Sequence, residues 1–240
     1  MKKIKLFCIP YSGSSASVYL AWKKDLPEYI ELVPIELLGH GARIREQLYK
    51  NVEEAVEDVT KSIASHLSKD EPYAILGHSM GSALAYEAYY ELKELGYQEP
   101  VHMFFSGRKA PIDCSGTTEF YKKSEEEFLK VVYKYGGTTK AIMDNPELKK
   151  LFLPILRADF MIAETYYSHG KSKKLQCDIT VTNGREDRSI AAVDMTKWDE
   201  ITDKKCNHKL LQGDHFFLIQ NMKMMINVVD EALSQSTNPH

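Results

Sequence analysis

Residues 77–81 have the sequence GHSMG, a GxSxG motif of the kind that presents a serine hydroxyl as a nucleophile. An apolar segment, Tyr73–Leu76, precedes the motif, and a segment with helical spacing of apolar residues, Ser82–Leu95, follows it. A tight turn between strand and helix raises the hydroxyl above the sheet, and flanking glycines let backbone segments approach closely. The helix start directs N–H groups toward developing negative charge. This context predicts that Ser79 is a catalytic nucleophile.

A serine nucleophile needs a general base, and three histidines follow the motif at a plausible distance: His169, His208 and His215. His215 comes just after Lys209–Leu211, which we expect to be the last strand, so its loop can reach the serine. His208 precedes that segment and is expected at the wrong end of the sheet, and His169 follows a helical block. His215 is therefore the predicted base. His78 is expected to pack beside the turn, because its side chain points away from that of the serine.

The base needs an acid to orient it, and in strand–turn–helix hydrolases the acid falls between serine and histidine in the chain. The segment Asp178–Thr182 is expected to be a strand that runs into two carboxylates, Glu186 and Asp187. Carboxylates at the end of a parallel strand point into the site. Asp187 is favoured, because a sharp turn at Gly184 can return its side chain to the histidine, and Glu186 is the reserve. Asp214 directly precedes the predicted base and is expected to face solvent.

The tetrahedral oxyanion of acyl transfer requires two hydrogen-bond donors. One is expected to be the backbone N–H of Met80, the residue after the nucleophile. The second should come from the loop after the first strand, where residues 10–15 read PYSGSS. The N–H of Ser12 is the predicted donor and that of Tyr11 the alternative. A phosphate-binding loop is disfavoured because no GK[ST] follows.

Short apolar segments alternate with segments of helical spacing such as Val52–Leu67, which predicts an α/β fold with a mostly parallel sheet and helices on both faces. The expected strands are Ile4–Ile9, Ile30–Ile35, Tyr73–Leu76, Val101–Ser106, Asp178–Thr182 and Lys209–Leu211. Residues 112–168 are almost wholly helical in pattern, with a capping box at Ser124 and Glu127 and a helix start at Asn145. We expect this block to be a lid inserted into one domain that spans residues 1–240.

Composition excludes several functional classes. The 240 residues carry a formal net charge of -3 and show no basic stripe for nucleic acid. No apolar stretch approaches the roughly 20 residues of a membrane helix, and the run Leu6–Ile9 is too short for a signal peptide. The four cysteines are far apart and show no CxxC spacing, which argues against disulfides or structural zinc. These features predict a cytoplasmic protein that binds neither nucleic acid nor membrane.

The sequence resembles the type II thioesterases that accompany nonribosomal peptide and polyketide synthases, which belong to the α/β-hydrolases. The matching segments run through most of the chain: Pro10–Gly13, Leu38–Arg43, Gly77–Gly81 with Tyr86 and Glu87, Ser106–Pro111, Tyr135–Thr138, Leu153–Phe160 with Glu164 and Tyr166, Gly184–Asp187, and Gly213–Leu218. The blocks LPILRADF and SGRKAP are the most specific. Leu38 stands where the family usually has proline, and Asp214 where it usually has a small residue.

The resemblance implies hydrolysis of misprimed or stalled acyl groups from the phosphopantetheine arm of acyl or peptidyl carrier proteins. It implies a triad of Ser79, Asp187 and His215. We expect the reaction to need no metal or organic cofactor, and the phosphopantetheine to belong to the carrier protein. Basic residues near the lid are expected to help dock an acidic carrier: Arg108, Lys109, Lys122, Lys123 and Lys171–Lys174. Two alternatives stay open, a small-molecule carboxylesterase or lipase-like hydrolase with the same triad, and a non-catalytic hydrolase-fold binding module.

Overall fold

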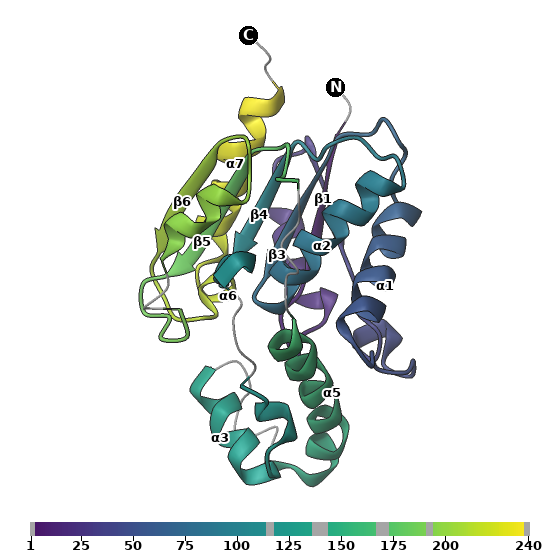
Figure 1. Cartoon of the computed structure of the whole chain (residues 1–240), viewed down its shortest axis with the longest axis vertical. Helices are drawn as coiled ribbons and strands as arrows, with labels where there is room; N and C mark the ends of the chain where they lie inside the picture. Colours follow the sequence, from purple (N-terminus) through teal and green to yellow (C-terminus); the bar gives the residue numbers. More distant parts are fainter. Residues whose placement is uncertain (1–2, 114–117, 136–143, 167–172, 191–193, 238–240) are drawn as a thin grey trace.

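A six-stranded sheet forms the centre of the protein (Figure 1). The computed structural model describes residues 3–113, 118–135, 144–166, 173–190 and 194–237. The strand order is β2-β1-β3-β4-β5-β6 and every neighbouring pair is parallel, so the predicted parallel α/β fold is confirmed. The strands are β1 (Ile4–Ile9), β2 (Ile30–Pro34), β3 (Tyr73–His78), β4 (His102–Ser106), β5 (Ile179–Gly184) and β6 (Cys206–Leu211).

Helices cover both faces of the sheet. Successive strand residues point to opposite faces, so each strand contributes side chains to two apolar cores. Phe7 and Ile75 pack into a core with α1 and α2, whereas Leu6 and Leu76 pack with η1 and α7. The α-helices are α1 (Val52–Ser65), α2 (Met80–Glu94), α3 (Glu125–Tyr135), α5 (Pro146–Thr165), α6 (Phe217–Gln220) and α7 (Met222–Thr237). Short 3₁₀ helices are η1 (Ala16–Lys24), η2 (Gly41–Arg43), η3 (Pro111–Asp113), η4 (Phe120–Lys122) and η5 (Met195–Glu200).

The helical block between β4 and β5 lies at one end of the sheet, where η4, α3 and α5 pack together (Figure 1). It has a small core of its own around Phe128, Val132 and Leu156. The predicted helix starts are present: Ser124 Oγ accepts the Glu127 N–H at 3.3 Å, and the Asn145 side chain caps α5. α3 ends at residue 135, and residues 136–143 lie outside the described ranges.

A buried carboxylate in α5 ties the helical block to two loops of the sheet. Asp159 Oδ2 accepts the Gly13 N–H at 2.6 Å and a hydrogen from His40 Nε2 at 2.9 Å. The other ring nitrogen, His40 Nδ1, lies 2.8 Å from the Leu38 carbonyl. Because both nitrogens face acceptors, both donate, and the imidazole carries a proton on each. Burial lowers the pKa of His40, but Asp159 and the Leu38 carbonyl outweigh burial and hold that pKa above its ordinary value.

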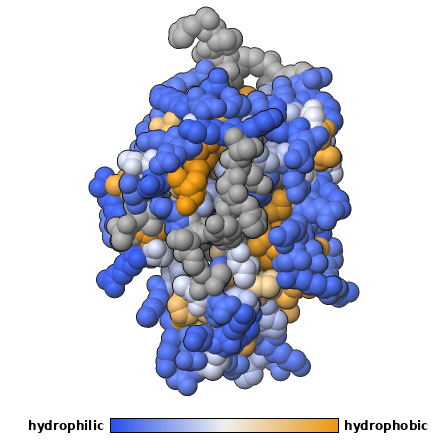
Figure 2. Space-filling model, in the orientation of Figure 1, coloured by the Kyte–Doolittle hydropathy of each residue, from blue (hydrophilic) through white to orange (hydrophobic). Residues whose placement is uncertain are grey.

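The visible surface is mostly hydrophilic, with apolar residues in separate patches (Figure 2). The large apolar side chains that are exposed come from several elements, among them Leu20 of η1, Leu95 after α2 and Leu151 of α5. Scattered single residues of this kind are normal for a folded domain. No helix in the described ranges combines the length and apolarity needed to cross a bilayer.

The buried pair of His40 and Asp159 predicts a pH-dependent stability. Asp159→Asn should lower the free energy of unfolding by about 3 kcal/mol, because it leaves buried donors without their charged acceptor. Since the pKa of His40 is raised on folding, the pair stabilises the protein fully below the unfolded pKa and less as pH rises through the folded pKa. The cost of the substitution should therefore be larger at about pH 6 than at about pH 9, measured by urea denaturation. Equal costs at both pH values would contradict a protonated His40.

The close contact of α2 with β1 predicts that Gly81 cannot be enlarged. A Cβ on Gly81 would lie 2.3 Å from the Ile9 carbonyl oxygen, a backbone atom that cannot move aside cheaply. Gly81→Ala should lower the free energy of unfolding by about 1–3 kcal/mol, although alanine is the better helix former. Urea denaturation of the variant measures this change. An unchanged or higher stability would show that α2 shifts away from β1 without cost.

Candidate active site

Three strand ends bring the predicted site residues together at the carboxyl edge of the sheet. Ser79 follows β3, Asp187 follows β5 and His215 follows β6. His215 Nε2 lies 3.0 Å from Ser79 Oγ, and His215 Nδ1 lies 2.6 Å from Asp187 Oδ2. Because all strands are parallel, their carboxyl ends meet at one edge, and residues far apart in sequence become neighbours there.

Ser79 occupies a sparsely populated backbone conformation, with φ 53° and ψ -113°. Such a conformation costs about 1–3 kcal/mol and persists only where the surroundings fix it. The Ser79 N–H donates to the Ser106 carbonyl at 2.7 Å. The Ser82 hydroxyl donates to the Gly77 carbonyl at 2.7 Å and accepts the Ser106 N–H at 3.1 Å. A Cβ on Gly77 would fall 2.2 Å from the Gly81 carbonyl oxygen, so glycine is required for this turn.

Asp187 is a buried carboxylate, 1% exposed, with hydrogen bonds to both oxygens. Its Oδ1 accepts the Ser189 N–H at 2.9 Å and the Ser189 hydroxyl at 2.6 Å. Burial raises the pKa of Asp187, but the hydrogen bonds from His215 and Ser189 outweigh burial and hold the pKa below its usual value. The ionised carboxylate accepts the Nδ1–H of His215. In the neutral imidazole, Nε2 is then an acceptor that faces the Ser79 hydroxyl.

His78 is completely buried and packs beside the turn, as the sequence suggested. Burial lowers the pKa of His78 to about 3, so the ring is neutral. Its Nε2 lies 2.9 Å from the His215 carbonyl, which can only accept, and its Nδ1 lies 2.8 Å from Ser106 Oγ. Nε2 therefore carries the hydrogen, and Nδ1 accepts from the Ser106 hydroxyl. His78 thus fixes the backbone of the predicted base, a contact that local sequence did not indicate.

The two other carboxylates considered as acids bind backbone groups instead of the imidazole. The Glu186 side chain accepts the Gly213 N–H. Asp214 Oδ1 accepts the Phe216 N–H at 2.8 Å and the residue is half-buried, so it faces solvent only in part. Both contacts shape the loop that carries His215.

Of the two other histidines considered as bases, only His208 lies in the described part of the chain, and it contacts a carboxylate instead of the serine. His208 lies within β6 and its Nε2 is 2.7 Å from Asp199 Oδ1. We expected His208 to precede the strand, which was wrong because β6 begins at Cys206. His169 lies outside the described residues.

Backbone N–H groups of Met80 and Ser12 are available near the nucleophile. Met80 is the first residue of α2, and the Ser12 hydroxyl donates to its sulfur at 3.7 Å. Among the described residues, neither backbone N–H has a hydrogen-bond acceptor. The neighbouring Gly13 N–H is engaged by Asp159. The Tyr11 ring packs edge-on against His78, so the loop is held close to the serine.

A cavity of about 430 Å³ opens at the serine, within the range for small-molecule sites. The nucleophile and the base line it from the sheet, and the helical block supplies the opposite wall through Val132, Tyr135, Leu156, Phe160 and Ala163. The Tyr135 ring packs edge-on against the His215 ring. Among the described residues, no group of three potential metal ligands gathers at this cavity.

Basic residues near the block differ in their surroundings. Arg108 and Lys109 line the cavity, and Arg108 also donates to the Ala163 carbonyl at 3.2 Å. Lys122 forms an exposed ion pair with Glu119. Of the predicted basic run, Lys171 and Ser172 lie outside the described residues, and Lys173 and Lys174 are exposed.

Comparison with known proteins identifies the family of the chain. The thioesterase domain family matches residues 4–233. The gramicidin S biosynthesis protein GrsT of Aneurinibacillus migulanus is 31% identical over 96% of this chain and 89% of its own. The human medium-chain S-acyl fatty acid synthase thioesterase is 31% identical over 97% of this chain and 88% of its own. The structure of ClbQ from the colibactin NRPS/PKS pathway is 30% identical, covers 98% of both chains and has a TM-score of 0.89. The chain therefore belongs to the thioesterase family.

Proposed function

We propose that the protein is a serine thioesterase that hydrolyses acyl groups from the phosphopantetheine arms of acyl or peptidyl carrier proteins of a nonribosomal peptide or polyketide synthase. The observation that carries this proposal is the continuous contact from Ser79 through His215 to Asp187 beside a cavity walled by helices. Similarity over almost the whole chain to proteins of synthase pathways supports the substrate class.

The proposed acylation step begins with attack of Ser79 Oγ on the thioester carbonyl. His215 Nε2, 3.0 Å away, accepts the hydroxyl proton. Asp187 holds the ring in the required tautomer and stabilises its positive charge without taking the proton. The N–H groups of Met80 and Ser12 stabilise the oxyanion, each by roughly 3–4 kcal/mol. The tetrahedral adduct collapses, and the thiol leaves with the proton from His215.

The proposed deacylation step uses the same residues with water as the nucleophile. His215 accepts a proton from water, which attacks the acyl-serine carbonyl, and the same N–H groups stabilise the second oxyanion. Collapse of this adduct breaks the ester bond, frees the acid and returns the proton to Ser79. The proposed mechanism uses no metal or organic cofactor. The phosphopantetheine is part of the carrier protein and therefore of the substrate.

The lining of the cavity supports the proposal of a substrate with an apolar acyl chain and an anionic group. Leu156 and Phe160 offer apolar surface to an acyl chain, whereas Arg108 and Lys109 place positive charge at the same cavity. The phosphodiester of a phosphopantetheine arm is negatively charged, and complementary charge speeds encounter with an acidic carrier more than it tightens the complex. The buried free thiols of Cys8 and Cys177 support a reducing, cytoplasmic location.

The proposal predicts that the carrier protein, rather than the thioester alone, defines the substrate. We expect kcat/KM for an acylated carrier protein to exceed that for a p-nitrophenyl ester or a small acyl thioester by at least about tenfold, or about 1.4 kcal/mol. Ser79→Ala should lower hydrolysis by roughly 10⁴-fold or more and leave the fold intact. Steady-state kinetics, with thermal denaturation as the control for folding, measure both.

Equal or higher kcat/KM on simple esters would favour the carboxylesterase alternative. A fluorophosphonate probe that labels neither the wild-type protein nor the Ser79→Ala variant would favour a non-catalytic binding module.

The position of the acid gives a second prediction. Asp187→Asn should lower kcat by about 10³–10⁴-fold, because an amide cannot stabilise the imidazolium and tends to set the wrong tautomer. Glu186→Gln and Asp214→Asn are matched controls that remove one charge from the same loops, and each should cost less than about tenfold. A crippled Glu186→Gln enzyme beside an active Asp187→Asn enzyme would reverse the assignment.

A further inference from the structure

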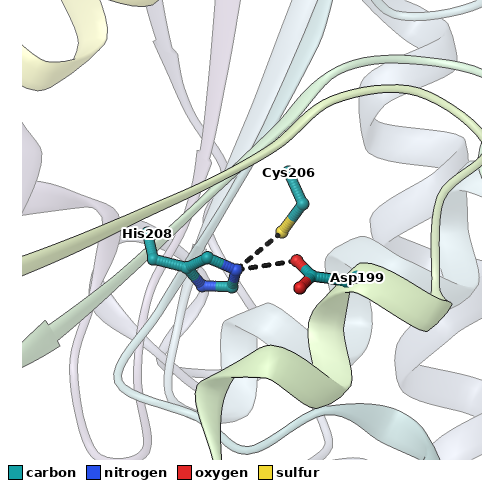
Figure 3. A group of neighbouring side chains, drawn as sticks. All are labelled: Asp199, Cys206 and His208. Carbon is teal, nitrogen blue, oxygen red and sulfur yellow. Dashed lines mark hydrogen bonds and ion pairs between the residues drawn. The ribbon is translucent and has the colours of Figure 1, made fainter.

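A second group of reactive side chains lies on the edge strand of the sheet, apart from the cavity. Cys206 and His208 are alternate residues of β6, so both side chains point to the same face. Asp199 of η5 lies over that face (Figure 3). His208 Nε2 is 2.7 Å from Asp199 Oδ1 and 3.5 Å from Cys206 Sγ. The three potential ligand atoms all lie within 4.8 Å of one another.

These distances are close to those of three ligands on one metal ion. Tetrahedral coordination with ordinary zinc bond lengths places sulfur and nitrogen about 3.6 Å apart, and nitrogen and oxygen about 3.4 Å apart. The sulfur–nitrogen distance of 3.5 Å therefore needs almost no change. The nitrogen–oxygen distance of 2.7 Å must open, which an exposed aspartate achieves by rotating its side chain.

We propose that Asp199, Cys206 and His208 bind a divalent transition metal ion of the zinc type. Thiolate and imidazole ligands favour zinc and its neighbours, whereas magnesium and calcium need several oxygen ligands and find one carboxylate here. The side chains of His208 and Asp199 are 29% and 53% exposed, so an ion can enter from solvent and keep water in the fourth position.

Metal binding displaces the proton of the Cys206 thiol and breaks the contact between His208 and Asp199. Cys206 is a free thiol. Formation of the metal–sulfur bond breaks the S–H bond and releases the proton to solvent, and the metal takes the place of the contact between His208 and Asp199. The nearby Asp194 side chain caps η5 by accepting the Thr196 N–H and adds negative charge.

The bound ion would fasten η5 to β6. η5 also carries Trp198, which stacks on Phe105 of β4 with ring centroids 4.4 Å apart. The Trp198 indole N–H donates to the Arg108 carbonyl at 3.2 Å, and Arg108 lines the cavity. The metal site thus stabilises a segment that supports the cavity, while Asp199, Cys206 and His208 do not line the cavity.

Titration of the whole protein with Co²⁺ tests the proposal. Tetrahedral cobalt with a thiolate ligand should give intense visible ligand-field bands and a near-ultraviolet sulfur-to-metal charge-transfer band, both bleached by Zn²⁺. Since loss of even an outer-shell partner typically costs about 10–100-fold in metal affinity, Cys206→Ser, His208→Gln and Asp199→Asn should each weaken binding by at least about tenfold. Cys206→Ser should also abolish the charge-transfer band.

Matched controls separate this site from other metal ligands. Glu200→Gln removes a carboxylate beside Asp199 on the same short helix, and His66→Gln removes an exposed histidine elsewhere, so both should bind Co²⁺ like the wild type. A roughly 100-fold excess of Zn²⁺ over its Kd should raise the Tm by about 5–10 °C in the wild type and not in the ligand variants. A wild-type protein without a charge-transfer band, or ligand variants that bind as the wild type does, would overturn the proposal.

Discussion

The backbone of Ser79 is the constraint on which the rest of the site depends. A conformation that costs about 1–3 kcal/mol must be held from several sides. Ser106, at the end of β4, provides most of that support, because its carbonyl accepts the Ser79 N–H and its N–H is bound by Ser82. Its hydroxyl binds His78, whose ring then donates to the His215 carbonyl. One strand end therefore positions both the nucleophile and the loop of the base, which explains how groups from three strands meet within hydrogen-bond distance.

A second buried network holds the opposite side of the cavity. Asp159 binds the N–H of Gly13, the residue after Ser12 in the same loop, and the same oxygen binds His40. This carboxylate belongs to α5, whose other residues form a wall of the cavity. The predicted oxyanion donor and the helical block are thus fixed by one charged contact. Since truncation of one partner of a buried charge pair is costly, the block cannot move far without disturbing the loop after β1.

Patterns of neighbouring residues in the sequence predicted the buried strands and the turns, whose structure depends on nearby residues. Four of the six strands, β1, β3, β4 and β5, are buried throughout or nearly so, and their short runs of apolar and β-branched residues predicted them. The turn at Gly184 predicted the contact of Asp187 with His215, which the structure has. The start of β6 was missed because an edge strand with the sequence CNHKLL shows no apolar run. α7 was also missed, although Met225, Ile226 and Val229 have helical spacing and are buried. The pairing of His40 with Asp159 joins residues 119 positions apart, which no local pattern reveals.

The leaving group explains how a common triad can serve a specific enzyme. A thiol has a pKa of about 8.5, so it departs as a far weaker base than an alkoxide and asks less of His215 as an acid. The proposed triad of Ser79, His215 and Asp187 alone would therefore act on many activated acyl groups. Discrimination between a carrier-bound thioester and a small thioester must come from groups that contact the substrate away from the carbonyl, because the reacting atoms of the two substrates are the same. Under the proposed function, such groups belong to the helical block and to the residues around Arg108, because these line the cavity with both apolar and positively charged side chains.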